Sequence, residues 1–140
     1  MPSTPEQKFY QRIVRAFPTW DFQRIETTTG SGVPDIHVCA KTRSGVAVTF
    51  WLETKIQKSK TTQIRKEQLA WTTKRGRLGD DVFIISLTPD DEVKVWECPI
   101  KEFETGRKDH VKILDKPWGF CWKSFKALDA SFFQSKQKVL

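Results

Sequence analysis

Three charged side chains in the first half of the chain are of types that can perform chemistry together. Asp35 ends the motif Gly32-Val33-Pro34-Asp35, and Glu53 and Lys55 flank a threonine in Glu53-Thr54-Lys55. Two adjacent carboxylates repel one another, and a divalent cation relieves that repulsion. A bound cation with an ammonium group beside it is suited to phosphodiester hydrolysis, because the cation polarises a phosphoryl oxygen and activates water.

A β-hairpin would bring these residues together. Residues 34–40 alternate between apolar and polar side chains, which is typical of a strand with one buried face. Residues 46–55 are rich in β-branched and aromatic residues, which favour a second strand. Residues 42–45 supply turn-forming side chains between the two. The sequence therefore predicts a hairpin with the charged residues on its arms.

The register of this hairpin decides whether the two acids meet. Asp35 and Glu53 are equally far along the chain from Ser44, so a turn centred on Ser44 pairs them across the two strands. Cross-strand partners point to the same face, and Lys55 returns to that face two residues after Glu53. A bulge or a slip by one residue would separate the acids.

The expected cation is Mg²⁺, with Asp35 and Glu53 as its ligands. Mg²⁺ prefers oxygen ligands and keeps several waters, so two carboxylates with open positions suit it. We expect Mn²⁺ to substitute for it, and no small-molecule cofactor. Lys55 is predicted to orient the attacking water or to offset negative charge on the phosphorus.

These motifs, in this order, resemble the PD-(D/E)xK nuclease superfamily. The resemblance rests on Gly32-Val33-Pro34-Asp35, then Glu53-Thr54-Lys55, then a predicted helix that carries Gln68 and Trp71 and ends near Gly76. Within the superfamily the chain is most similar to the stand-alone VRR-NUC domains of phages and bacteria. The archaeal Holliday-junction resolvases are near relatives of these domains.

The resemblance covers about residues 6–96 and implies a set of roles. It implies that Asp35 and Glu53 hold Mg²⁺, and that Lys55 serves the attacking water. It also implies that an acid from an N-terminal helix completes the metal site, and Glu6 stands at that place. The alternative for Glu6 is a first-turn acid that the helix dipole favours.

The resemblance also implies a fold and a substrate. The fold would be a restriction-endonuclease-like α/β domain, with a mixed β-sheet flanked by helices. The activity would be an endonuclease on branched DNA, of the Holliday-junction-resolvase type, and a homodimer would present one site to each of two paired strands.

A helix is predicted from Thr61 or Thr62 to about Arg75, with Gly76 as its C-terminal cap. Ile64, Gln68 and Trp71 would share its inward face. Gln68 then either reaches the metal site or a scissile phosphate, or is a core amide with satisfied hydrogen bonds.

Basic side chains cluster around this helix, with Glu67 as the only acid among them. We predict that they contact DNA phosphates, and the alternative is a solvated helix face. The predicted nucleic-acid-binding residues are Lys58, Lys60, Arg65, Lys66, Lys74, Arg75 and Arg77.

Length and charge agree with a single nucleic-acid-binding domain. The chain has 140 residues and a formal net charge of +7 at pH 7, which favours a polyanionic partner. We expect one nuclease domain over residues 1–140, with a core at about 6–98 and an aromatic-rich extension at 99–140.

The cellular setting follows from cysteine use and hydropathy. The three cysteines lack C-x-x-C spacing and so do not predict a zinc site, and no apolar run approaches the roughly 20 residues that cross a bilayer. An odd cysteine count without a signal peptide predicts the cytoplasm, of a bacterium or of a phage-infected host, and no membrane partner.

Further elements frame the hairpin. A helix is predicted from Glu6 to Pro18, a strand over residues 20–26, and a glycine-bearing loop over 27–32 that either offers N–H groups to a phosphate or only connects. Residues 82–87 predict a buried central strand and 93–98 its neighbour.

The C-terminal part is less periodic. Residues 89–92 read as a solvated acidic turn, 100–103 as the start of a short helix, and 111–114 as a short strand. The aromatic tail from Pro117 either covers the sheet of its own chain, or forms a dimer contact or a base-stacking surface.

Two rival functions remain open at this point. A sequence-specific endonuclease of homing or restriction type would use the same metal motif. A non-catalytic DNA-binding module would keep the basic residues but would have no reason to place two acids and a lysine on one face. An RNA substrate is also open, since nothing in the sequence reports on a 2′-hydroxyl.

Overall fold

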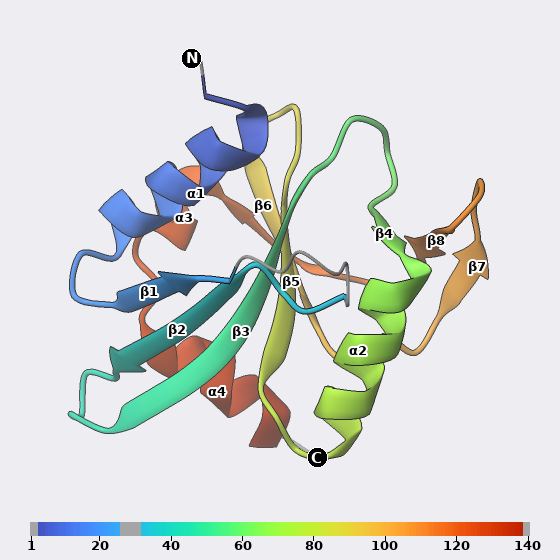
Figure 1. Cartoon of the computed structure of the whole chain (residues 1–140). Coiled ribbons are helices and arrows are strands. Elements are labelled where there is room, and N and C mark those ends of the chain that lie inside the picture. Colours follow the sequence, from blue (N-terminus) through green and yellow to red (C-terminus); the bar gives the residue numbers. More distant parts are fainter. Residues whose placement is uncertain (1–2, 26–31, 139–140) are drawn as a thin grey trace.

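A six-stranded mixed sheet organises the part of the chain that the computed structural model describes, residues 3–25 and 32–138 (Figure 1). The strands lie in the order β1-β2-β3-β5-β6-β9, with β3 and β5 parallel and the other neighbours antiparallel. They are β1 (Asp21–Arg24), β2 (Ile36–Lys41), β3 (Ala47–Ile56), β5 (Val82–Leu87), β6 (Glu92–Glu97) and β9 (Trp118–Cys121). A smaller sheet has the order β4-β8-β7, from β4 (Gln63–Arg65), β8 (His110–Ile113) and β7 (Phe103–Thr105).

The predicted hairpin is the β2–β3 pair, in the predicted register. Ile36 pairs with Leu52 and Lys41 pairs with Ala47, so the turn is centred on Ser44. Gly45 lies in this turn with a φ of 86°, a left-handed conformation that glycine adopts at little cost. The burial of β2 alternates along the strand, as the sequence predicted.

The first helix, α1 (Pro5–Ala16), begins and ends close to its predicted bounds. The Thr4 hydroxyl accepts a hydrogen bond from Gln7 N (3.1 Å), and Gln7 Oε1 accepts one from Thr4 N (2.9 Å). This capping box satisfies two backbone donors at the helix start. Phe9 and Ile13 are buried, so α1 packs its apolar side on the sheet.

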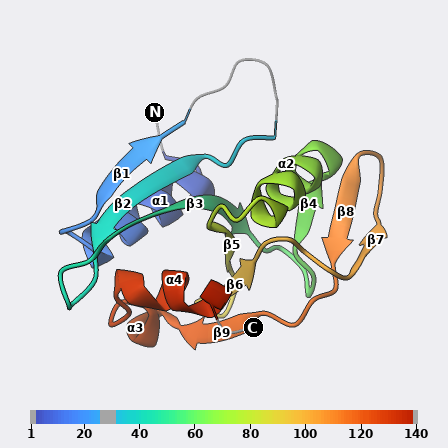
Figure 2. The same cartoon turned by 90° about the horizontal axis from the view of Figure 1, so that it is seen from below.

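One face of the sheet carries an aromatic core under α1, α3 (Trp122–Phe125) and α4 (Ala130–Lys138). Figure 2 shows α3 and α4 on one side of the sheet and α2 (Lys66–Arg77) on the other. Phe133 is fully buried and stacks on Phe50 of β3 at 4.9 Å between ring centroids. The prediction that the aromatic tail covers the sheet of its own chain is confirmed.

The opposite face of the sheet carries α2 and the small sheet. Trp51 of β3 meets Trp71 of α2 edge-on, with ring centroids 5.4 Å apart. Arg75 lies over the Trp71 ring at 4.8 Å and forms an ion pair with Asp80 at 2.7 Å. Since Glu53 and Lys55 alternate with the buried Leu52, they lie on this second face, beneath α2.

The structure corrects the predicted start and end of the second helix. Residues 63–65 form strand β4, which pairs with β8, and α2 begins only at Lys66. Ile64 is therefore a buried strand residue and not part of the helix face. Gly76 lies inside α2, where a Cβ would come within 2.8 Å of Cys98 O, so close packing rather than helix termination requires glycine there.

Other predicted elements differ more modestly. Residues 100–103 form no helix, because Phe103 begins strand β7 and pairs with Ile113 of β8. The first strand is shorter than predicted and begins at Asp21. The glycine-bearing loop predicted over 27–32 lies outside the described residues except for Gly32. The central strand β5, strand β6 and the acidic turn before it are confirmed.

Among the described residues, none of the helices has both the length and the apolar character that a bilayer crossing requires.

Candidate active site

A pocket of about 360 Å³ opens where the N-terminal ends of α1 and α2 meet the ends of β1 and β3. The lining residues are mostly charged or polar. They are Thr4, Glu6, Gln7, Arg24, Asp35, Glu53, Thr54, Lys55, Arg65 and Gln68. The fold thus brings the five residues predicted for catalysis and metal binding to one cavity.

Asp35 and Glu53 come together through the hairpin register. Asp35 immediately precedes β2, whose first residue Ile36 pairs with Leu52, the residue before Glu53. Both residues line the pocket, and the Asp35 charge helps to raise the pKa of Glu53, so the two carboxyls are neighbours.

Thr54 holds the Asp35 carboxylate in place. Asp35 Oδ1 accepts a hydrogen bond from the Thr54 backbone N at 3.0 Å, and Oδ2 accepts one from Thr54 Oγ1 at 2.6 Å. Thr54 is only 5% exposed, so water competes little for these bonds. Sequence reasoning treated Thr54 as the neutral middle of the motif and missed this role.

Gln68 links the two functional groups of β3. Its Nε2 donates a hydrogen bond to Glu53 Oε1 at 2.7 Å, and its Oε1 accepts one from Lys55 Nζ at 2.9 Å. Oε1 also accepts a bond from the Arg65 backbone N at 2.8 Å. Since a lysine can only donate, these contacts fix which end of the amide faces Glu53. The amide is therefore buried with satisfied hydrogen bonds, as one of the two alternatives predicted, and it also lines the pocket beside Glu53 and Lys55.

The surroundings of Glu53 oppose its ionisation. Burial, followed by the nearby Asp35 charge, raises the pKa of Glu53 to about 9, and the charges of Lys55 and Arg65 act in the opposite direction. These surroundings therefore favour the protonated form of the Glu53 carboxyl. A positive ion placed between the acids would remove the cause of this shift.

The donor set fits a hard divalent cation such as Mg²⁺. Asp35 and Glu53 offer carboxylate oxygens, the ligand type that Mg²⁺ prefers. Glu6 lines the same pocket, but it is exposed, and the described residues contain no cluster of three acidic, histidine or cysteine side chains that could hold a metal together. Two protein carboxylates, with water or phosphate oxygens as further ligands, match the open coordination typical of Mg²⁺.

The predicted DNA-binding residues lie in several places around α2. Arg65 lines the pocket and pairs with Glu67 at 2.8 Å. Lys58 lines a neighbouring hollow that it shares with Lys55, and Lys60 is exposed on the same loop.

Arg75 is engaged by Asp80 and by two tryptophans, Trp51 and Trp71. Lys66, Lys74 and Arg77 lie along the outer side of α2 and line another hollow.

Sequence reasoning also missed Thr4, Gln7 and Arg24, all of which line the pocket. Arg24 reaches it because β1 pairs with β2, so that Arg24 lies opposite Ile36, next to Asp35. Its guanidinium lies 4.8 Å from the Tyr10 ring centroid. Arg24 could have been predicted as a pocket residue only from the pairing of β1 with β2, which local sequence patterns do not specify.

Comparisons with known proteins locate the fold. No protein-family model matches the sequence, and no curated protein matches it. Among solved structures, the chain is similar to Hjc of Archaeoglobus fulgidus, a Holliday junction resolvase from an archaeal hyperthermophile. The TM-score is 0.54 at 14% sequence identity, over 79% of this chain and 84% of that chain. The fold is therefore the predicted restriction-endonuclease-like α/β fold, with a mixed sheet flanked by helices.

Proposed function

We propose that this protein is a Mg²⁺-dependent endonuclease that hydrolyses DNA phosphodiester bonds, with branched DNA as its substrate. The observation that carries the proposal is the Asp35–Glu53 pair, in which the pKa of Glu53 is raised to about 9 and which Gln68 connects to Lys55. Bringing two acids together in a partly buried pocket destabilises the fold. Perturbed groups of this kind are typical of functional sites, and metal-assisted hydrolysis requires such a pair.

Asp35 and Glu53 would hold the cation. When bound, Mg²⁺ would polarise a phosphoryl oxygen and lower the pKa of a water molecule. Thr54 fixes the position of the Asp35 carboxylate through a hydrogen bond to each of its oxygens. Gln68 keeps Glu53 from turning away, since its amide is itself anchored by the Arg65 backbone.

Lys55 supplies a positive side chain in the same pocket as Asp35 and Glu53. An ammonium has three donors, and one of them is committed to Gln68 Oε1. The other N–H groups can orient the attacking water or offset negative charge that develops on the phosphate. Arg65 and Arg24, which line the same pocket, would bind the flanking phosphates.

The preference for branched DNA, and a homodimer that presents two sites to paired strands, are further parts of this proposal. They are supported by the likeness in fold to a Holliday junction resolvase and by the net charge of +7. Light scattering coupled to size-exclusion chromatography would give a dimer twice the molar mass of the 140-residue chain.

The test compares cleavage of a synthetic four-way junction with cleavage of a random linear duplex, in Mg²⁺, Mn²⁺, Ca²⁺ and EDTA. The expected result is junction cleavage in Mg²⁺ and Mn²⁺, which Asp35→Asn and Lys55→Ala abolish while DNA affinity in EDTA persists. Asp21→Asn, an exposed acid on β1, is the matched control and should cut normally.

Two results would contradict the proposal in different ways. Equal cutting of junction and duplex would remove the structural specificity and favour a sequence-directed endonuclease. Absence of cleavage on every DNA and RNA substrate, with binding intact, would identify a non-catalytic binding module.

A further inference from the structure

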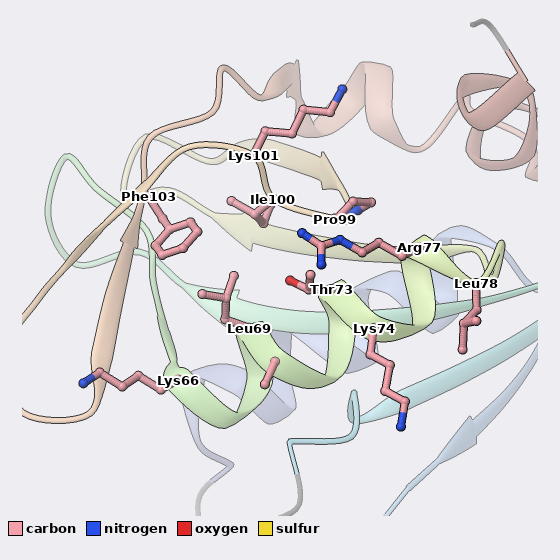
Figure 3. A pocket seen from close by; sticks show the side chains of 11 residues that line it. Lys66, Leu69, Thr73, Lys74, Arg77, Leu78, Pro99, Ile100, Lys101 and Phe103 are labelled. Carbon is pink, nitrogen blue, oxygen red and sulfur yellow. The ribbon is translucent and has the colours of Figure 1, made fainter.

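A second hollow, which we call the α2 groove, lies between the outer side of α2 and residues 99–103 (Figure 3). Its volume is about 760 Å³, about twice that of the candidate active site. The lining residues are Lys66, Leu69, Ala70, Thr73, Lys74, Arg77, Leu78, Pro99, Ile100, Lys101 and Phe103. The groove therefore extends along most of the helix.

The floor of the α2 groove is apolar and open to solvent. Leu69 of α2 faces Ile100 across it, and Phe103 and Leu78 stand at its two ends (Figure 3). Phe103 is 48% exposed and Leu78 is 75% exposed, although both are large hydrophobic residues. Exposed apolar surface of this kind, bordered by polar groups, is typical of a binding site.

The border of the groove is strongly positive. Lys66, Lys74, Arg77 and Lys101 line it, and no acidic side chain does. Among the residues that the structure describes, none of these four cations forms an ion pair. Arg65, in contrast, forms an ion pair with Glu67. The groove thus suits a ligand that is both anionic and apolar.

The groove and the candidate active site share the first turn of α2. Arg65 and Gln68 line the active-site pocket, while the residues that follow each of them, Lys66 and Leu69, line the groove. A polymer that lies in the pocket and continues around the start of α2 would therefore enter the groove.

Three occupants of such a groove can be compared. A second copy that docks through the same face would bring four cations against four cations, which opposes association. Duplex DNA keeps the faces of its bases stacked inside the helix, so it has nothing to place on an apolar floor. Unpaired nucleotides offer both phosphates for the cations and base faces for the exposed Phe103 ring.

We propose that the α2 groove binds unpaired nucleotides of a DNA strand that continues from the cleavage site. The inference rests on the proposed function for the identity of the polymer, and it narrows the substrate to branched DNA with a single-stranded arm near the cut. Lys66 and Lys101 would contact phosphates at the Phe103 end, and Lys74 and Arg77 would contact phosphates further along α2.

The test measures binding in EDTA, so that it does not depend on cleavage. A fluorescent four-way junction is compared with the same junction carrying an unpaired tail of about six thymidines, within the roughly 4–16 nucleotides that such grooves hold. The tail should raise affinity about tenfold or more, as stacking of one base on an aromatic ring supplies. Phe103→Ala should remove that gain and leave the affinity for the tailless junction unchanged.

Matched controls separate the groove from general effects. Leu114→Ala removes an equally exposed apolar residue outside the groove and should keep the gain from the tail. Lys74→Ala should lower the salt slope of tail binding by about 0.7, the value for one contact with single-stranded DNA. Lys126→Ala, which removes an exposed lysine beside α3, should not. Thermal unfolding of Phe103→Ala shows whether the variant is folded.

Each outcome decides the inference. No gain from the tail, or a gain that survives Phe103→Ala, overturns it. Binding of an acidic amphipathic peptide that depends on Phe103, without a gain from the tail, would assign the groove to a protein partner and also overturns it. Cleavage without a gain from the tail overturns the groove inference alone, whereas a gain without any cleavage overturns the nuclease proposal alone.

Discussion

Gln68 of α2 donates a hydrogen bond across 2.7 Å to Glu53 of β3, and this contact ties the helix to the acid at the centre of the site. The same amide receives Lys55 Nζ. One side chain of α2 thus helps to position both the Glu53 carboxyl and the Lys55 ammonium. The stability and the chemistry of the site are therefore coupled through Gln68.

Gln68→Ala should lower both the stability of the protein and the rate of cleavage. It leaves Glu53 Oε1, Lys55 Nζ and the Arg65 backbone N without their partner, at about 1–3 kcal/mol for each group that stays buried. We expect a lower melting temperature and slower cleavage, with DNA affinity in EDTA little changed. Gln23→Ala, on the exposed side of β1, is the control. Unchanged cleavage by a folded Gln68→Ala variant would show that the amide has no part in positioning.

The raised pKa of Glu53 predicts how stability depends on pH in EDTA. The folded protein keeps the Glu53 proton up to about pH 9, whereas the unfolded chain loses it near 4.5. Between these values the unfolded state binds fewer protons, so the free energy of unfolding falls as pH rises, by at most about 1.4 kcal/mol per pH unit for this group.

Urea unfolding at several pH values in EDTA measures this slope. Glu53→Gln removes the titrating group, so the variant should gain stability relative to the wild type as pH rises from 5 to about 8.5. Added Mg²⁺ should stabilise the wild type most at the upper end of this range and should have little effect on Glu53→Gln. Parallel curves for the two proteins would contradict the assigned proton.

Thr54→Val tests the orientation of Asp35. The substitution keeps the shape of the side chain and the backbone bond at 3.0 Å, but removes the hydroxyl bond at 2.6 Å. Loss of a group that positions a metal ligand typically costs about 10–100-fold in metal affinity or activity. The measurement is the Mg²⁺ concentration that gives half-maximal cleavage. Thr49→Val, on an exposed position of the same strand, should leave it unchanged.

Gly32→Ala tests the approach of the chain to α2 just before Asp35. Gly32 has a φ of 80°, and a Cβ there would clash with Glu67 O, so neither the conformation nor the space admits a side chain. We expect the first turn of α2 to shift, with a loss of cleavage and a lower melting temperature. Gly45→Ala shares the positive φ but has open space around it, and should lose stability without losing the site. Equal effects of the two substitutions would show that the contact with Glu67 is unimportant.

The sequence predicted the centre of the site because the information there is local. Alternation along β2, the turn around Ser44 and equal spacing on either side fix the register without reference to distant residues. Strand β4 was missed because its partner β8 lies far along the chain, and residues 63–65 read locally as the start of a helix. Arg24 was missed for the same reason, since its place depends on long-range pairing.

Alternation along β3 also separates two kinds of selection. Phe50 and Leu52 belong to the aromatic core, where the volume of the side chain limits substitution. Glu53 and Lys55 line the pocket, where the charge of the side chain limits it. Replacing the acid leaves the aromatic layer intact, so under the proposed function a single substitution at Glu53 would abolish cleavage while the fold is retained. The fold can therefore persist when the pocket residues change, because different residues of β3 maintain the core.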